Sequence, residues 1–125
     1  MLPMTIYDQG DAALPSRVVL IPFPFTDQSG GKQRPAVVLS SAAHNRRHSD
    51  VILAPVTSQV GQAYDEASLQ DWHASGLLKP SVVKPLLSSL DVRLIRRKLG
   101  ALSALDRREV CALFARVLDL PAQAP

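Results

Sequence analysis

Arg34 and Thr57 are the residues whose chemistry and position best suit work on a phosphate. Arg34 follows the polar segment 27–33 and precedes Pro35. The proline restricts the backbone of Arg34 to extended conformations, which helps to aim its guanidinium off a strand. Thr57 supplies a hydroxyl at the end of the apolar run 50–56. Because each residue stands where a strand is expected to meet a loop, the two can meet on one rim and stabilise a phosphate that gains charge during reaction.

The segment 27–35 is a candidate phosphate-binding loop. Gly30 and Gly31 tolerate positive φ and bring backbone N–H groups close to a ligand. Lys32 and Arg34 place cations beside those donors. The alternative is an ordinary long hairpin with a solvated tip.

His44 and His48 are further candidates for proton transfer, because histidine titrates near neutral pH. Their spacing resembles a two-histidine metal pair, but the sequence places no third ligand beside them. A solvated basic loop is the competing interpretation. Cys111 is the single cysteine, which excludes a disulfide framework and fits a reducing compartment. We therefore expect neither a metal site nor a cofactor.

The elements that would position these residues are short strands followed by one helix. The expected strands are 18–23, 36–40, 50–56, a weaker 63–69, 81–84 and about 95–102, with a glycine-closed turn at 71–76. Ser103 and Asp106 stand in an N-capping arrangement. A stripe at helical spacing follows them, formed by Leu105, Val110, Cys111, Phe114, Val117 and Leu118. This order predicts a mainly β protein with a C-terminal helix, built as a small antiparallel barrel or a strongly curved sheet.

Length and charge set the outer limits of the interpretation. The 125 residues are sufficient for one domain, which we expect at 18–120, after a flexible extension at 1–17 and before a short tail at 121–125. The sequence shows no apolar run long enough to span a membrane and no signal peptide. The net charge is +3, and residues 79–108 carry eight cations against two acids. Such a basic surface is consistent with nucleic acid, although it is equally common on proteins that bind none.

Four blocks of sequence together resemble one protein family. They are PFPFTDQSGGKQRPAVVLS at 22–40, DVILAPVTS at 50–58, GLLKPSVVK at 76–84 and RKLGALS at 97–103. In this order they are similar to the MazF/PemK family, the ribonuclease toxins of bacterial type II toxin–antitoxin pairs. The resemblance covers about 18–118. It implies an SH3-like barrel with a C-terminal helix, a cytoplasmic homodimer whose groove holds RNA, and an antitoxin partner.

The resemblance also implies roles for individual residues. Arg34 and Thr57 match the arginine and the threonine that the family uses in catalysis. Around them we expect polar and cationic side chains to bind RNA, namely Lys32, Gln33, Asn45, Arg46, Ser58, Gln59, Lys79 and Lys84.

The general base is where the chain departs from the family. Some members carry a glutamate at a place that corresponds to about Ser29, and the nearest acid here is Asp27. Others carry an arginine and an aspartate two residues apart, where this chain has Lys84 and Leu86. Leucine cannot transfer a proton. The chain is thus a slow nuclease, one that uses Asp27, or one that relies on arginine and oriented hydroxyls.

The function expected from the sequence is metal-independent, sequence-selective cleavage of single-stranded RNA or mRNA through attack of a ribose 2′-OH, which stops translation and growth. One alternative is a non-enzymatic toxin on the same fold that poisons gyrase by protein contact. Another is a catalytically weak member that binds only its antitoxin. Arg34 and Thr57 favour the nuclease, whereas Leu86 favours the weak member.

Overall fold

The computed structural model describes residues 14–22, 32–61 and 65–121. Its elements are β1 (Arg17–Pro22), β2 (Gln33–Val38), α1 (Ala42–Arg47), β3 (Asp50–Thr57), β4 (Ala67–Ser68), β5 (Val82–Val83), β6 (Ser88–Asp91), the 3-10 helix η1 (Val92–Leu94), β7 (Arg97–Ala101) and α2 (Ala104–Val117).

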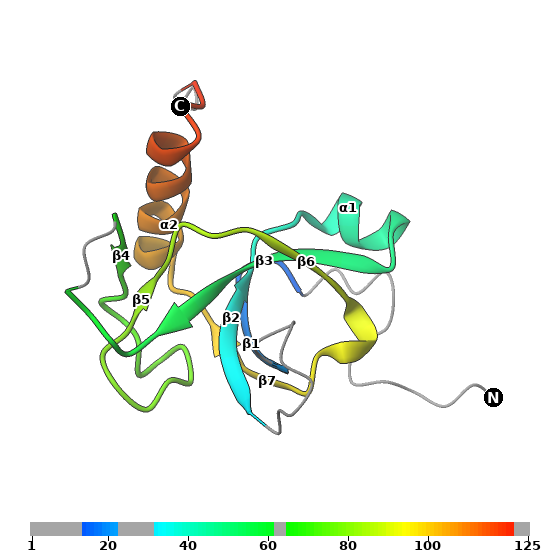
Figure 1. Ribbon diagram of the computed structural model, residues 1–125, viewed down its shortest axis with the longest axis horizontal. Helices are drawn as coiled ribbons and strands as arrows, with labels where there is room; N and C mark the ends of the chain where they lie inside the picture. Colours follow the sequence, from blue (N-terminus) through cyan, green and yellow to red (C-terminus); the bar gives the residue numbers. More distant parts are fainter. Residues whose placement is uncertain (1–13, 23–31, 62–64, 122–125) are drawn as a thin grey trace.

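The strands form one antiparallel sheet that curls into a half-barrel (Figure 1). The order across it is β4-β5-β3-β2-β1-β7. The long strand β3 is shared, since its first half pairs with β6 and its second half with β5. The expected mainly β architecture with a closing C-terminal helix is therefore confirmed.

Alternation along the strands builds two hydrophobic clusters, because successive side chains point to opposite faces. In β1, Val19 and Ile21 join the first cluster, whereas Val18 joins the second. The second cluster includes Val110, Leu113 and Phe114 of α2, so the helix covers part of that face of the sheet.

The start of α2 follows the sequence prediction, but Asp106 does more than expected. The Ser103 hydroxyl accepts a hydrogen bond from the backbone N–H of Asp106 at 3.1 Å, which confirms Ser103 as the N-cap. The Asp106 side chain is fully buried and accepts from the backbone N–H groups of Gln70 and Asp71, both at 2.8 Å. This carboxylate therefore ties α2 to the turn at 70–76.

The buried face of α2 differs from the predicted stripe. Val110 and Phe114 are buried as expected, but the other members of the stripe are exposed, namely Leu105, Cys111, Val117 and Leu118. The core positions of the helix are instead Asp106, Val110, Leu113 and Phe114. The prediction was wrong here because it gave no core position to an acid, and Asp106 fixes the rotation of the helix by its two hydrogen bonds.

Several element boundaries also differ from the prediction. The expected strand 63–69 is only Ala67–Ser68, and residues 62–64 lie outside the described part of the chain. The strand Ser88–Asp91, which pairs with β3, was not anticipated. Leu14 is buried in the first core cluster, ahead of the domain start expected at Val18. Within the described ranges, no helix is both long and apolar enough to cross a bilayer.

Candidate functional site

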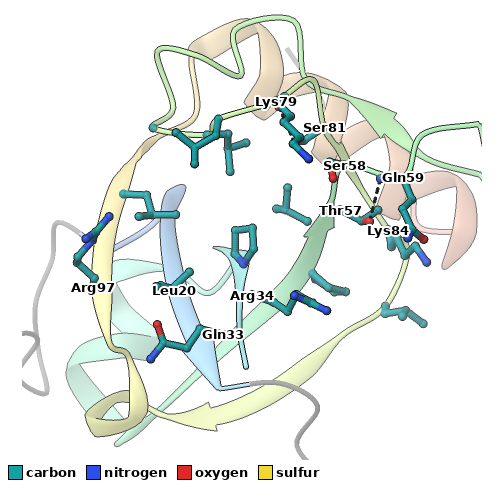
Figure 2. A pocket seen from close by; sticks show the side chains of 18 residues that line it. Leu20, Gln33, Arg34, Thr57, Ser58, Gln59, Lys79, Ser81, Lys84 and Arg97 are labelled. Atoms are coloured by element: carbon teal, nitrogen blue, oxygen red, sulfur yellow. Dashed lines mark hydrogen bonds between the residues drawn. The ribbon is translucent and has the colours of Figure 1, made fainter. Parts of the chain in front are cut away.

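A cavity of about 700 Å³ lies between the ends of the strands that carry the residues of interest. Figure 2 shows its lining as a ring of side chains from β1, β2, β3, β7 and the segment 76–86. The charged residues that line it are Arg34, Lys79, Lys84 and Arg97. Among the described lining residues there is no aspartate or glutamate, so the cavity favours an anionic ligand.

Arg34 and Thr57 lie on neighbouring strands at one side of this cavity. Ala36 of β2 pairs with Pro55 of β3, and two residues outward along each strand lead to Arg34 and to Thr57. The Arg34 side chain is exposed, and among the described residues its guanidinium has no hydrogen-bond or ion-pair partner. It is available to bind a phosphate.

The Thr57 hydroxyl is oriented by its own loop. Its oxygen accepts a hydrogen bond from the backbone N–H of Gln59 at 3.1 Å (dashed in Figure 2). A hydroxyl that accepts in this way keeps its proton for donation to another group. Thr57 can therefore donate to an oxygen of a ligand in the cavity.

Lys84 and Leu86 line the cavity on the same side as Thr57. The backbone N–H of Leu86 donates to the carbonyl of Lys84 at 2.8 Å, which closes a tight turn around Pro85. Leu86 is 55% exposed, so it offers the cavity an apolar surface where some family members were expected to offer an acid.

The opposite rim is held in place by a close approach of two backbones. Gly76 has φ +89°, and a Cβ at this position would lie 2.0 Å from the carbonyl oxygen of Leu99 on β7. A Cβ on Gly100 would lie 2.4 Å from the carbonyl oxygen of Ser75. Only glycines permit this contact, which seats the segment that carries Lys79 against the sheet.

Seven of the residues predicted to act on RNA line the cavity. They are Gln33, Arg34, Thr57, Ser58, Gln59, Lys79 and Lys84. Lys32 is exposed next to Gln33 but does not line the cavity, and Arg46 is exposed on α1, outside the lining. Asp27, the predicted base, lies outside the described residues.

Asn45 does not fit its predicted role in RNA binding. Its side chain is 2% exposed and its amide is used within the fold. The Ser40 hydroxyl donates to Asn45 Oδ1 at 2.7 Å, and Asn45 Nδ2 donates to the Ser40 carbonyl at 3.2 Å. The expectation failed because a polar residue in a polar stretch was assumed to face solvent.

The two histidines of α1 also lie outside the cavity lining. The rings of His44 and His48 stack with centroids 4.5 Å apart, and His44 Nε2 lies 3.1 Å from the carbonyl oxygen of Asp50. In the ranges that the structure describes, no group of three or more His, Cys, Asp or Glu side chains is arranged to hold a metal ion.

Arg97 is a lining residue that sequence reasoning did not single out. It belongs to the stretch 93–98, which carries four cations. Arg97 is the one of these that lines the cavity in the described structure, because it pairs with Leu20 of β1, another lining residue.

Comparison with protein families matches residues 15–118 to the PemK-like, MazF-like toxin of type II toxin–antitoxin systems. Comparison with curated proteins gives no match.

Solved structures with this fold include MazF toxins. The Mycobacterium tuberculosis toxin MazF-mt6 is 21% identical, with a TM-score of 0.69 over 85% of this chain and 99% of that one. A MazE–MazF structure from Deinococcus radiodurans is 30% identical, with a TM-score of 0.68 over 86% of this chain and 95% of the other. A mycobacterial endoribonuclease in complex with its cognate antitoxin is 20% identical, with a TM-score of 0.69 over 90% of this chain and 99% of that chain.

Proposed function

Because this chain belongs to the PemK-like, MazF-like toxin family of type II toxin–antitoxin systems, we propose that it is an endoribonuclease that cleaves single-stranded mRNA in the bacterial cytoplasm. The observation that carries the proposal is that Arg34 and Thr57 lie at adjacent strand ends and both line one cavity. The cationic lining of that cavity supports an anionic substrate. One structural neighbour is itself described as an endoribonuclease, which agrees with the proposal.

The reaction begins with attack of a ribose 2′-OH on the adjacent phosphorus. The attack places additional negative charge on the non-bridging oxygens, and the Arg34 guanidinium stabilises that charge through two parallel hydrogen bonds. The Thr57 hydroxyl donates a hydrogen bond to the same phosphate, because its oxygen already accepts the N–H of Gln59. The bond from phosphorus to the 5′-oxygen breaks as the bond to the 2′-oxygen forms, and the 5′-oxygen takes up a proton from solvent. The products are a 2′,3′-cyclic phosphate and a free 5′-OH.

The base that removes the 2′-OH proton is assigned to Asp27, the nearest acid in sequence to Arg34. Leu86 lines the cavity but has no ionisable group, and Lys84 beside it is a cation. Neither residue can therefore act as the base, a role that an arginine–aspartate pair at these positions could fill. The reaction does not require a metal ion, because the nucleophile belongs to the substrate.

The proposed partners are a cognate antitoxin and a second copy of the chain. Structural neighbours from Deinococcus radiodurans contain MazE together with MazF. An acidic antitoxin segment suits the same cationic cavity and would compete with RNA for it. Leu78 and Leu86 at the rim are 92% and 55% exposed, which offers apolar surface for a second protomer or an antitoxin to cover.

The direct test replaces Arg34 by alanine and compares it with Arg46→Ala. Both arginines are exposed, but only Arg34 lines the cavity. Arg34→Ala should slow cleavage of a long RNA by about 100-fold or more, whereas Arg46→Ala should cut at the wild-type rate. Both variants should retain the wild-type circular dichroism spectrum. Equal rates for folded Arg34→Ala and wild type would refute the assignment.

A second candidate function is favoured by Leu86. A chain without an acid at this position would be a weak nuclease that acts mainly by binding its antitoxin. The two functions are distinguished by incubating increasing concentrations of the wild-type protein with RNA for long times and measuring cleavage. Site-specific cuts that disappear in Arg34→Ala support the nuclease, and intact RNA together with tight antitoxin binding supports the weaker member.

A further inference from the structure

Arg97 begins a row of side chains that crosses the sheet toward the catalytic side of the cavity. Leu20 of β1 pairs with Arg97 on one side and with Pro35 of β2 on the other. All three residues line the cavity, and Arg34 follows next to Pro35 along β2. The backbones of β7 and β2 are two strand spacings apart, which is about 10 Å.

The chemistry of this row alternates between charge and apolar surface. The half-buried side chains of Leu20 and Pro35 form an apolar floor. The guanidinium groups of Arg97 and Arg34 lie on either side of this floor. Figure 2 shows Arg97 and Arg34 on different sides of Leu20 within the same cavity. A nucleic acid strand has the same alternation, with anionic phosphates separated by nucleosides whose faces are largely apolar.

We propose that Arg97 is a positioning residue that binds a phosphate of the RNA strand next to the one cleaved, while the intervening nucleoside lies on Leu20 and Pro35. This inference rests on the proposed function. It assigns Arg97 to holding the strand in register, so that the scissile phosphate meets Arg34 and Thr57, and gives it no part in the bond-making step.

The surroundings of Arg97 suit a contact with a phosphate better than sequence-specific hydrogen bonds to the edge of a base. Its side chain is exposed, and among the described residues no hydrogen bond or ion pair fixes the direction of its guanidinium. Reading a base edge requires donors and acceptors held in a set geometry, whereas a phosphate tolerates a mobile cation. The apolar floor beside it presents no side-chain donor or acceptor.

The strand itself provides a matched control. Lys98 follows Arg97 on β7, is exposed and carries the same charge, but does not line the cavity. It pairs with Val19, which does not line the cavity, whereas Arg97 pairs with the lining residue Leu20. Arg97→Gln and Lys98→Gln therefore remove the same net charge from adjacent positions, of which only Arg97 lines the cavity.

The experiment measures binding and cleavage separately in the full chain. Binding is measured with a short RNA that carries the mapped cleavage site and a single 2′-deoxy nucleotide before the scissile bond. Arg97→Gln should weaken this binding by about tenfold at low salt and reduce the slope of log K against log salt by about 0.7, the value for one phosphate contact on a single strand. With cleavable RNA, KM should rise while kcat stays near wild type. Lys98→Gln should leave all of these values near wild type.

The outcomes separate this inference from the function on which it rests. If wild type neither binds nor cuts RNA, both fail. If wild type cuts RNA but Arg97→Gln behaves like Lys98→Gln, only the role of Arg97 is wrong. If Arg97→Gln lowers the affinity for one RNA sequence and not for others, the proposed phosphate contact is also wrong, because such a difference would indicate contact with a base. A fall in kcat alone would contradict a positioning role.

Discussion

Replacing Gly76 by alanine tests how the cavity rim is built. Gly76 has φ +89°, and an added Cβ would meet the Leu99 carbonyl oxygen at 2.0 Å and its carbonyl carbon at 2.5 Å. These are backbone atoms of a paired strand, so they cannot move aside as the end of a long side chain would. The turn must instead lift away from β7, and it would take the lining residues Leu77 and Lys79 with it.

Gly61 supplies the control for this change. It also has a positive φ, +79°, but a Cβ there would meet no atom within 4 Å. An alanine in this backbone region costs about 1–2 kcal/mol, partly offset by about 0.4–1 kcal/mol from the less flexible unfolded chain. Gly61→Ala should therefore lower the free energy of unfolding by about 1 kcal/mol or less. Gly76→Ala adds the steric term, about 3 kcal/mol at the upper end for overpacking, for a total near 3–4 kcal/mol.

Thermal and denaturant unfolding of both variants provide the measurement. At about 4 °C per kcal/mol for a domain of this size, Gly76→Ala should melt about 12–16 °C below wild type and Gly61→Ala within about 4 °C of it. RNA affinity should fall in Gly76→Ala and remain unchanged in Gly61→Ala. If the two variants differ by less than about 1 kcal/mol, the close packing of this turn on β7 does not hold the rim as argued.

Three further predictions concern single side chains. Asp106→Asn should lower the free energy of unfolding by about 2–3 kcal/mol in denaturant titrations, because an amide cannot accept from both backbone N–H groups that the buried carboxylate satisfies. Leu86→Asp, especially with Lys84→Arg, should raise the rate of RNA cleavage if the missing acid limits it, and an unchanged rate would favour Asp27 as the base instead. The pKa of Asp91 is lowered from 3.8 to about 2 by hydrogen bonds from Arg93, so its stabilising contribution should be complete above about pH 4 and lost as the pH falls toward 2. The stability difference between wild type and Asp91→Asn should shrink over that interval, and a constant difference would contradict it.

The residues of the candidate site were more predictable than their geometry. Arg34 and Thr57 stand beside apolar strands in a recognisable pattern, and strand ends meet at sheet rims. Arg97 lacks such a signal, because three neighbouring residues of its run carry the same charge. Only the register against Leu20 decides which of them faces the cavity. Register depends on long-range pairing, which a local pattern does not contain.

Two of the errors, those at Asp106 and Asn45, have a common physical origin in buried polar residues. Asp106 and Asn45 are both among the buried side chains, and each is stabilised by hydrogen bonds that local sequence does not reveal. Asp106 receives N–H groups from residues 35 and 36 positions away. A pattern of apolar spacing assigns such residues to solvent. For this reason the predicted buried face of α2 left out Asp106. The longer strands β1, β2 and β3 and the N-cap at Ser103 were predictable because their signals are local.

The central claim is cleavage by the substrate's own 2′-OH beside Arg34 and Thr57. The measurement is cleavage of one RNA and of the same RNA with a single 2′-deoxy nucleotide immediately before the mapped cut site, both in EDTA. The account predicts that the unmodified RNA is cut to a 2′,3′-cyclic phosphate and a 5′-OH, and that the modified RNA is left intact at that bond. Cleavage of the modified RNA at the same bond would contradict it.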